Sequence, residues 1–142
     1  MNFADLKSRI DEQQVQRILA LSLFQPTMPQ AIACVVNRCR SNDERKLWGV
    51  LNGEQILGVV EYYFRDDGVI YVCNIAVIEA CRGQGVGRFM LAALQEKYNL
   101  PLALETDDDA VGFYRKCGFE AESFIHADYG VRRWRCLRQA DQ

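Results

Sequence analysis

Two amphipathic patterns open the chain, on either side of a proline-flanked stretch at residues 25–29. In both, apolar residues recur at the i, i+3, i+4 spacing of one helical face. Asp11 precedes the first pattern as an N-cap, and the polar run 40–45 closes the second. We therefore expect two helices, with inward faces formed by Val15, Ile18, Leu19 and Leu23 and by Ile32, Val35, Val36 and Cys39.

The pattern then changes to short runs rich in β-branched and aromatic residues. The runs 47–51 and 56–64 flank Asn52-Gly53, a dipeptide typical of a tight type I′ hairpin turn. A second turn signal, Asp-Asp-Gly at 66–68, leads into a further run at 69–77. These three runs predict an antiparallel meander.

A β-loop-α-β unit follows the meander. Residues 86–98 keep one apolar helical face, and residues 101–105 form the next β-rich run. A helical crossover returns the chain in the same direction, so the strands before and after this helix are expected to be parallel.

The last third of the chain predicts one more helix and one more hairpin. The helix covers 108–116 and stops at Gly118, and the strands 119–125 and 131–137 complete a mixed sheet. At the other end of the chain, residues 3–6 supply only a weak first strand, which we expect to be short or helical.

Composition narrows the classes of protein. A length of 142 residues fits one domain, expected over 1–142, and 49% hydrophobic residues can fill its core. Seventeen Lys and Arg against nineteen Asp and Glu give a formal charge of −2. This balance lacks the basic excess of a nucleic-acid-binding surface, so no nucleic acid partner is expected.

Cysteine usage and the chain start point to a reduced, soluble protein. Six cysteines contain no CxxC pair and there is one histidine, so we expect no metal site. The first residues lack the pattern of a secretory signal, and no apolar stretch approaches the ~20 residues of a membrane-crossing helix. We expect a cytoplasmic protein with no membrane partner.

The sharpest chemical signal lies between the predicted strand at 69–77 and the helix at 86–98. Its glycines can adopt positive φ and let a ligand approach the backbone, while the first turn of the helix offers free N–H groups to an anion. Two arginines add positive charge. The stretch predicts a phosphate cradle made of Arg82, Gly83, Gln84, Gly85, Val86, Gly87 and Arg88.

Other phosphate loops fit this stretch less well. A Walker A loop needs Gly-Lys-Ser/Thr, whereas Gly87 is followed by Arg88 and Phe89. A dinucleotide fingerprint starting at Gly83 would have Arg88 at its third glycine, although Glu105 does follow about twenty residues on. A nucleotide-binding module and a simple helix-capping turn both stay open as alternatives.

The glycine loop is followed by a second motif, Ala-Val-Gly-Phe-Tyr-Arg-Lys-Cys-Gly-Phe at 110–119. With the strand ending Asn74-Ile75-Ala76-Val77, the two motifs resemble the GNAT superfamily of acyl-CoA-dependent N-acetyltransferases in detail from Ile70 to Phe119. The resemblance implies an α/β fold: a three-layer αβα domain whose mixed, mostly antiparallel sheet has one parallel, splayed strand pair.

The resemblance also implies acetyl-CoA as co-substrate. The backbone N–H groups of residues 82–88 would hold the coenzyme A pyrophosphate, and the backbone of Ile75, Ala76 and Val77 would pair with the pantetheine arm. A backbone N–H at Asn74 or Ile75 would polarise the thioester carbonyl.

Two side chains are the candidate catalytic residues. Tyr114 matches the tyrosine that in many relatives protonates the departing thiolate, and a hydroxyl with a pKa near ~10 is protonated at neutral pH. The alternative is a core tyrosine. Glu61 lies in an apolar run, where partial burial would raise its pKa and suit it as base or as anchor for a cationic amine. The alternative for Glu61 is a place on the solvent face of its strand.

Other residues carry weaker signals. Cys73 has no activating partner, so an acetylated thiol is disfavoured. Asp107 to Asp109 are expected to cap a helix rather than form a site, and relatives often carry Asn at the position of Asp107. Phe24 is a candidate cover for the acceptor pocket. An exposed strand is expected to carry Arg132, Arg133, Arg135 and Arg138.

The predicted reaction is transfer of an acetyl group from acetyl-CoA to a primary amine of a small molecule or peptide, by direct attack in a ternary complex. A non-catalytic acyl-CoA-binding module is the main alternative. Many relatives dimerise, so a homodimer is compatible with the resemblance.

Overall fold

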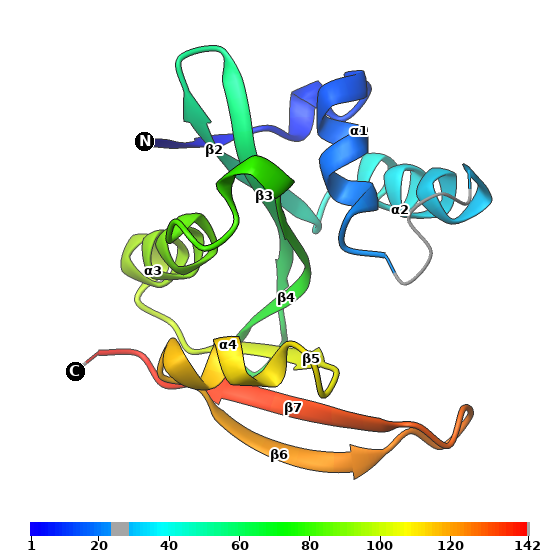
Figure 1. Ribbon diagram of the computed structural model, residues 1–142, viewed down its shortest axis with the longest axis vertical. Helices are drawn as coiled ribbons and strands as arrows, with labels where there is room; N and C mark the ends of the chain where they lie inside the picture. Colours follow the sequence, from blue (N-terminus) through cyan, green and yellow to red (C-terminus); the bar gives the residue numbers. More distant parts are fainter. Residues whose placement is uncertain (24–28, 142) are drawn as a thin grey trace. The chain divides into compact units, whose positions relative to one another are not determined.

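The computed structural model describes residues 1–23 and 29–141 (Figure 1). Over these residues the chain forms a seven-stranded mixed sheet in the order β1-β2-β3-β4-β5-β7-β6, together with four α-helices. The strands are β1 (Asn2–Asp5), β2 (Lys46–Asn52), β3 (Gln55–Phe64), β4 (Ile70–Val77), β5 (Leu102–Thr106), β6 (Glu120–Ile125) and β7 (Arg132–Arg138). The helices are α1 (Gln13–Ala20), α2 (Pro29–Ser41), α3 (Val86–Tyr98) and α4 (Val111–Lys116).

The chain divides into two compact units. The first unit contains Met1–Tyr63 and Val72–Leu94, and the second contains Phe64–Tyr71 and Gln95–Gln142. Along the chain, the helices and strands follow one another in the predicted order.

The weak first strand of the first unit is present. β1 pairs antiparallel with β2, from Asn2 opposite Leu51 to Asp5 opposite Trp48, and a short 3-10 turn at Lys7–Arg9 follows it. The short strand and the helical turn thus occur one after the other, and β1 lies at one end of the strand order.

The hairpin of β2 and β3 differs in detail from its prediction. Asn52 pairs with Gln55, so the two-residue loop is Gly53-Glu54 and not Asn52-Gly53. Only Gly53, at φ 62°, is left-handed, whereas a type I′ turn needs positive φ at both loop residues. The register also shifts between Val50 and Leu51, which places one extra residue in β3.

Helices cover both faces of the sheet in the first unit (Figure 1). On one face, α1 and α2 pack against β2 to β4 around a core that includes Ile18, Val36 and Val59. On the other face α3 packs closely on β3, because a Cβ at Gly58 would lie 2.9 Å from Cε of Met90. The predicted three-layer arrangement is therefore found in this unit.

The apolar spacing of the first two helices predicted their buried faces correctly. Val15, Ile18 and Leu19 of α1 are buried, as are three apolar residues of α2. The N-cap prediction was wrong by one residue: Glu12 occupies the N-cap position of α1 and makes no side-chain capping bond. Asp11 instead pairs with Arg40 at the end of α2.

The second unit contains the parallel strand pair that the crossover predicted. Ile70 and Tyr71 of β4 pair in parallel with Leu102 and Ala103 of β5. β5 then pairs antiparallel with β7, and β7 with β6, so the sheet is mixed and mostly antiparallel as expected.

A buried glutamine fastens the C-terminal strand of the second unit. Gln95 Nε2 donates to the carbonyls of Leu100, Arg138 and Gln139, and its Oε1 accepts from Arg138 Nε. Arg138 also donates to the carbonyl of Cys117 at 2.9 Å. Arg138 is therefore a half-buried structural residue and Arg133 is half-buried as well, whereas Arg132 and Arg135 are exposed as expected.

Among the described residues, no helix combines the length and apolar character needed to cross a membrane.

Candidate functional site

The glycine loop of the first unit forms an exposed turn in front of α3. Gly83 and Gly85 have φ of 78° and 85°, a conformation that favours glycine. A Cβ at either position would meet no heavy atom within 4 Å, so the backbone is open to an approaching group. The first helical bond runs from Phe89 N–H to the Gly85 carbonyl. The amides of the first turn therefore lack helical acceptors and are available to an anion.

Side chains of the loop are partly committed to the backbone before it. Arg82 Nε lies 3.4 Å from the carbonyl oxygen of Val77, and Gln84 Nε2 lies 3.3 Å from that of Ala80. Both contacts are long, and both side chains are exposed. An arriving anion can thus engage Arg82 at little cost.

The end of β4 leads directly into this loop. Ala76 is buried, whereas Ile75 and Val77 are half-buried. The N–H of Ile78 donates to the carbonyl of Leu57 at 2.9 Å, which fixes the end of β4 against β3. The pairing of this backbone with a pantetheine arm stays a prediction.

Glu61 does not lie on a solvent face. Its side chain is 0% exposed, on the face of β3 that α1 and α2 cover. Asn74 Nδ2 of β4 donates to Glu61 Oε1 at 2.6 Å, and Ser22 Oγ donates to Asn74 Oδ1 at 3.1 Å. Arg45 Nη1 lies 3.5 Å from the same Glu61 oxygen. The structure therefore brings Glu61 next to the residue predicted to lie at the thioester.

Three members of this cluster carried no sequence signal. Arg45 belongs to the polar run after α2, Ser22 follows α1, and the side chain of Asn74 was not singled out. These three residues and Glu61 come from four segments that are far apart in the chain, and the packing of those segments brings them together. No spacing rule within one segment reports such a contact.

The two cysteines near this cluster are poor nucleophiles. Burial raises the pKa of Cys73 to about 11, with Arg45 opposing and Glu61 adding to the shift. Burial and then the Glu61 carboxylate raise the pKa of Cys39 to about 12. Both thiols are protonated at neutral pH, which supports direct attack over an acetylated cysteine.

Tyr114 belongs to the second unit and lies on α4. It is 7% exposed, and its ring packs edge-on against Phe113 at 5.0 Å and Phe119 at 5.6 Å between centroids. Burial, followed by the neighbouring Cys136 and Cys117, raises the pKa of Tyr114 above its ordinary value. Its hydroxyl therefore stays protonated far into the alkaline range and can serve as a proton donor.

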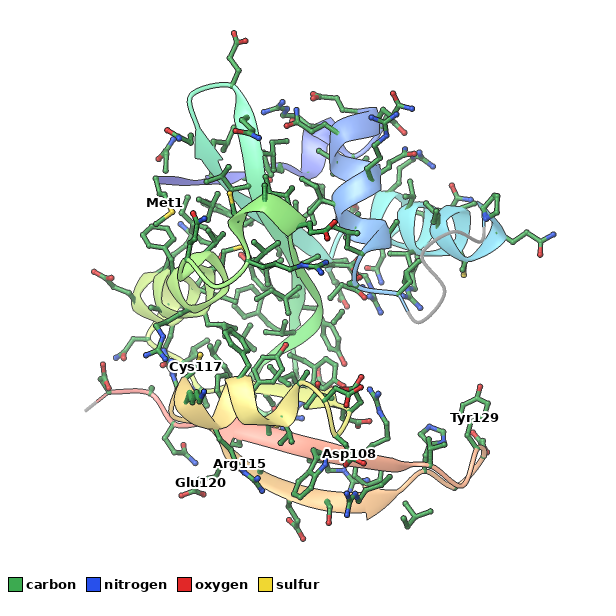
Figure 2. All side chains as sticks on the ribbon, in the orientation of Figure 1. Met1, Asp108, Arg115, Cys117, Glu120 and Tyr129 are labelled. Atoms are coloured by element: carbon green, nitrogen blue, oxygen red, sulfur yellow. The ribbon has the colours of Figure 1, made fainter. Side chains whose placement is uncertain are left out.

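The acidic run before α4 makes local hydrogen bonds but does not supply the expected N-cap, because that position is Ala110, which makes no side-chain capping bond. Asp107 Oδ1 accepts from the N–H of Ala110 at 2.9 Å. Asp108 accepts from Arg132 Nε and from Trp134 Nε1, while Arg115 lies over the Trp134 ring at 4.7 Å. Figure 2 labels Asp108 and Arg115, which hold this tryptophan of β7.

Phe24 lies outside the described residues. Within residues 1–23 and 29–141, no group of three or more His, Cys, Asp or Glu side chains is arranged to hold a metal ion.

Comparisons with known proteins agree on one family. The acetyltransferase (GNAT) family matches residues 13–119. No curated protein matches the chain significantly.

Solved structures of the same fold resemble the chain at low identity. One is an aminoglycoside 6'-N-acetyltransferase complexed with coenzyme A (TM-score 0.76, 13% identity, 97% of this chain and 96% of that one). Another is the ribosomal-protein-S18-alanine N-acetyltransferase from Escherichia coli (0.74, 16%, 99% and 93%). A third is a Bacillus subtilis acetyltransferase in complex with CoA (0.61, 16%, 76% and 84%). With the family match over most of its length, the chain belongs to the GNAT family of acetyltransferases.

Proposed function

We propose that this protein transfers an acetyl group from acetyl-CoA to a primary amine of a small molecule or peptide. The observation that supports this proposal most directly is the open glycine backbone of the loop before α3. The amides in the first turn of α3 suit a pyrophosphate. Family membership and the two neighbours bound to coenzyme A support this reading.

The cofactor contacts follow from the loop geometry. The amides of Gly83, Gly85, Val86 and Gly87 would bind the pyrophosphate, with positive charge from Arg82 and Arg88 beside them. The half-buried backbone of residues 75–77 would accompany the pantetheine arm. Acetyl-CoA supplies an acetyl group already activated as a thioester.

Proton handling falls to two side chains in this proposal. Glu61 would accept the proton of the attacking amine or hold its ammonium form, because Oε2 has no hydrogen-bond partner among the described residues. Tyr114 would donate its hydroxyl proton to the departing thiolate, and its raised pKa keeps that proton in place over a wide pH range. Both roles can be tested by mutagenesis.

An amine panel tests this function directly. Acetyl-CoA is supplied with amino acids, short peptides, polyamines and aminoglycosides, and free coenzyme A thiol is measured with and without enzyme. We expect amine-dependent thiol release. Saturating acetyl-CoA at about a hundred times its Kd should stabilise the protein by ~2.7 kcal/mol, whereas NAD or ATP should not.

Each of the other outcomes would indicate a different function for this protein. Stabilisation by acetyl-CoA without thiol release for any amine would indicate a non-catalytic acyl-CoA-binding module. Stabilisation by NAD or ATP instead would indicate a nucleotide-binding module, and it would contradict the proposal.

A further inference from the structure

The buried cluster around Glu61 contains two polar atoms that no described residue satisfies. Oε2 of Glu61 and Nη1 of Arg45 are both buried, and neither has a hydrogen-bond partner. The first is an acceptor on a fully buried side chain, and the second is a donor on a side chain that is 17% exposed. Leaving such groups unpaired is costly, and more so when they are charged.

The hydrogen bonding of the Glu61 carboxylate is asymmetric. Oε1 accepts from Asn74 Nδ2 at 2.6 Å, while Arg45 Nη1 stands 3.5 Å from the same oxygen. A charge-assisted N–H to carboxylate bond is normally about 2.7–2.9 Å long. Glu61 Oε2 and Arg45 Nη1 thus lack a partner by hydrogen-bond geometry within the described residues, while the Cys39 thiol also approaches the Glu61 carboxylate.

The position of Arg45 is held from the backbone side. Lys7 Nζ donates to the carbonyl of Asn42 at 2.6 Å and to the carbonyl of Arg45 itself. These two bonds hold the backbone of the turn between α2 and β2, from which the Arg45 side chain reaches Glu61. Ser22, Arg45 and Asn74 are only partly buried, so the cluster reaches the surface through these three side chains.

A free acceptor beside a free donor selects for a ligand that can both donate and accept. The ammonium of a polyamine or of a lysine side chain only donates, and it would add a cation next to Arg45 without satisfying Nη1. An amine with an oxygen acceptor on the neighbouring carbon satisfies both atoms.

We propose that the acceptor is an α-amino group flanked by a carbonyl or carboxylate, as in an amino acid or a peptide N-terminus. Glu61 Oε2 binds its amine and Arg45 Nη1 binds its oxygen. Arg45 is then a specificity-determining residue. This inference rests on the proposed acetyl transfer and narrows the acceptor class for the same site.

Free L-lysine tests the inference within one molecule, because it carries an α-amine and an ε-amine. Acetylated products are separated and assigned by mass spectrometry and NMR. We expect acetylation at Nα. A short peptide with a free N-terminus and an internal lysine forms the second arm, and the arm with the higher kcat/KM identifies the source of the α-amine.

Variants connect this selectivity to Arg45. Arg45→Met should lower kcat/KM for the α-amine at least about tenfold, the size of one charge-assisted hydrogen bond, and should leave the KM for acetyl-CoA unchanged. Arg45→Lys should recover part of the loss because it keeps the charge. Arg40→Met, an exposed arginine paired with Asp11, is the matched control and should behave as wild type.

The outcomes separate this inference from the proposed function. Acetylation at Nε, or of polyamines in preference to both arms, would overturn the α-amine assignment and leave acetyl transfer intact. Selectivity unchanged in Arg45→Met would overturn the role of Arg45. If no amine at all is acetylated, the proposed function fails. The preference for an α-amine can then still be tested by measuring ligand binding. L-Alanine should then shift the side-chain amide resonance of Asn74 in NMR titrations more than ethylamine does, and equal responses would refute it.

Discussion

Two strand-to-helix junctions in this protein differ in how the backbone amides at the start of the helix are hydrogen-bonded. After β4, glycines at positive φ lead into α3, whose first helical bond runs from Phe89 N–H to the Gly85 carbonyl. After β5, the carboxylate of Asp107 accepts from Ala110 N–H, and its carbonyl accepts from Val111 N–H at 3.1 Å. The first junction leaves its donors open, and the second satisfies them internally.

This difference separates two kinds of candidate site. An open, glycine-lined turn offers backbone donors and the positive end of a 13-residue helix to an external anion. The second junction leads into a helix of six residues, and its contribution is the side chain of Tyr114, which is 7% exposed. A charged or glycine-rich loop before a helix is thus a binding site only where the loop does not use the amides itself.

Packing beneath the open junction should show the largest effect. Gly58→Ala would place Cβ 2.9 Å from Cε of Met90 and 3.0 Å from the carbonyl oxygen of Ala76, so the Met90 side chain and the backbone of β4 must give way. We expect a loss of about 2 kcal/mol in the free energy of unfolding, measured by urea denaturation. Gly112→Ala on α4 is the control, since its Cβ meets no atom within 4 Å and should stabilise the helix slightly. Equal effects of the two variants would contradict the packing described here.

Removal of the Tyr114 hydroxyl should come next. Tyr114→Phe keeps the ring packing and is expected to lower kcat at least about tenfold, or ~1.4 kcal/mol on the barrier. Because the pKa of Tyr114 is raised, the wild-type hydroxyl stays protonated and the ratio of the two rates should be constant from about pH 6 to 9. Tyr129→Phe, at an exposed position, should not change the rate. A fully active Tyr114→Phe enzyme would remove Tyr114 from the mechanism.

A matched pair of glycines separates strain from ligand binding. Gly85→Ala and Gly53→Ala both place a side chain at positive φ in open space, so each should cost about 1–2 kcal/mol of stability. Only Gly85→Ala should also raise the KM for acetyl-CoA, because only that backbone would approach the pyrophosphate. An unchanged KM in Gly85→Ala would argue against the open junction as the cofactor site.

The smallest effects are expected at the second junction. Asp107→Ala removes the acceptor of the Ala110 N–H and should destabilise the protein by about 1 kcal/mol, whereas Asp107→Asn keeps an accepting oxygen and should cost much less. Thermal unfolding of both variants measures the difference. Neither should change the KM for acetyl-CoA if this junction is closed to ligands. A lower KM in Asp107→Asn would instead show that the carboxylate disfavours the cofactor.

Local signals predicted most of the elements and the glycine loop. The helical faces of α1 and α2, the parallel pairing of β4 with β5 and the open turn at Gly83 and Gly85 all follow from periodicity, crossover length and glycine conformation. The N-cap at Asp11 and the turn at Asn52-Gly53 each missed by one residue. Capping and turn preferences are small energies, and a shift of one residue in pairing or packing overrides them.

The sequence alone determined the type and order of the elements and the place of an anion-binding turn, since these depend on neighbours a few residues apart. Only the tertiary structure decided that Glu61 is buried and that Arg45, Asn74 and Ser22 surround it. The alternating pattern of a strand indicates its two faces. It does not show whether a polar side chain on the face covered by helices will have hydrogen-bond partners there. Those partners come from distant segments, and burial makes their pairing matter because an unpaired charge in the interior is costly.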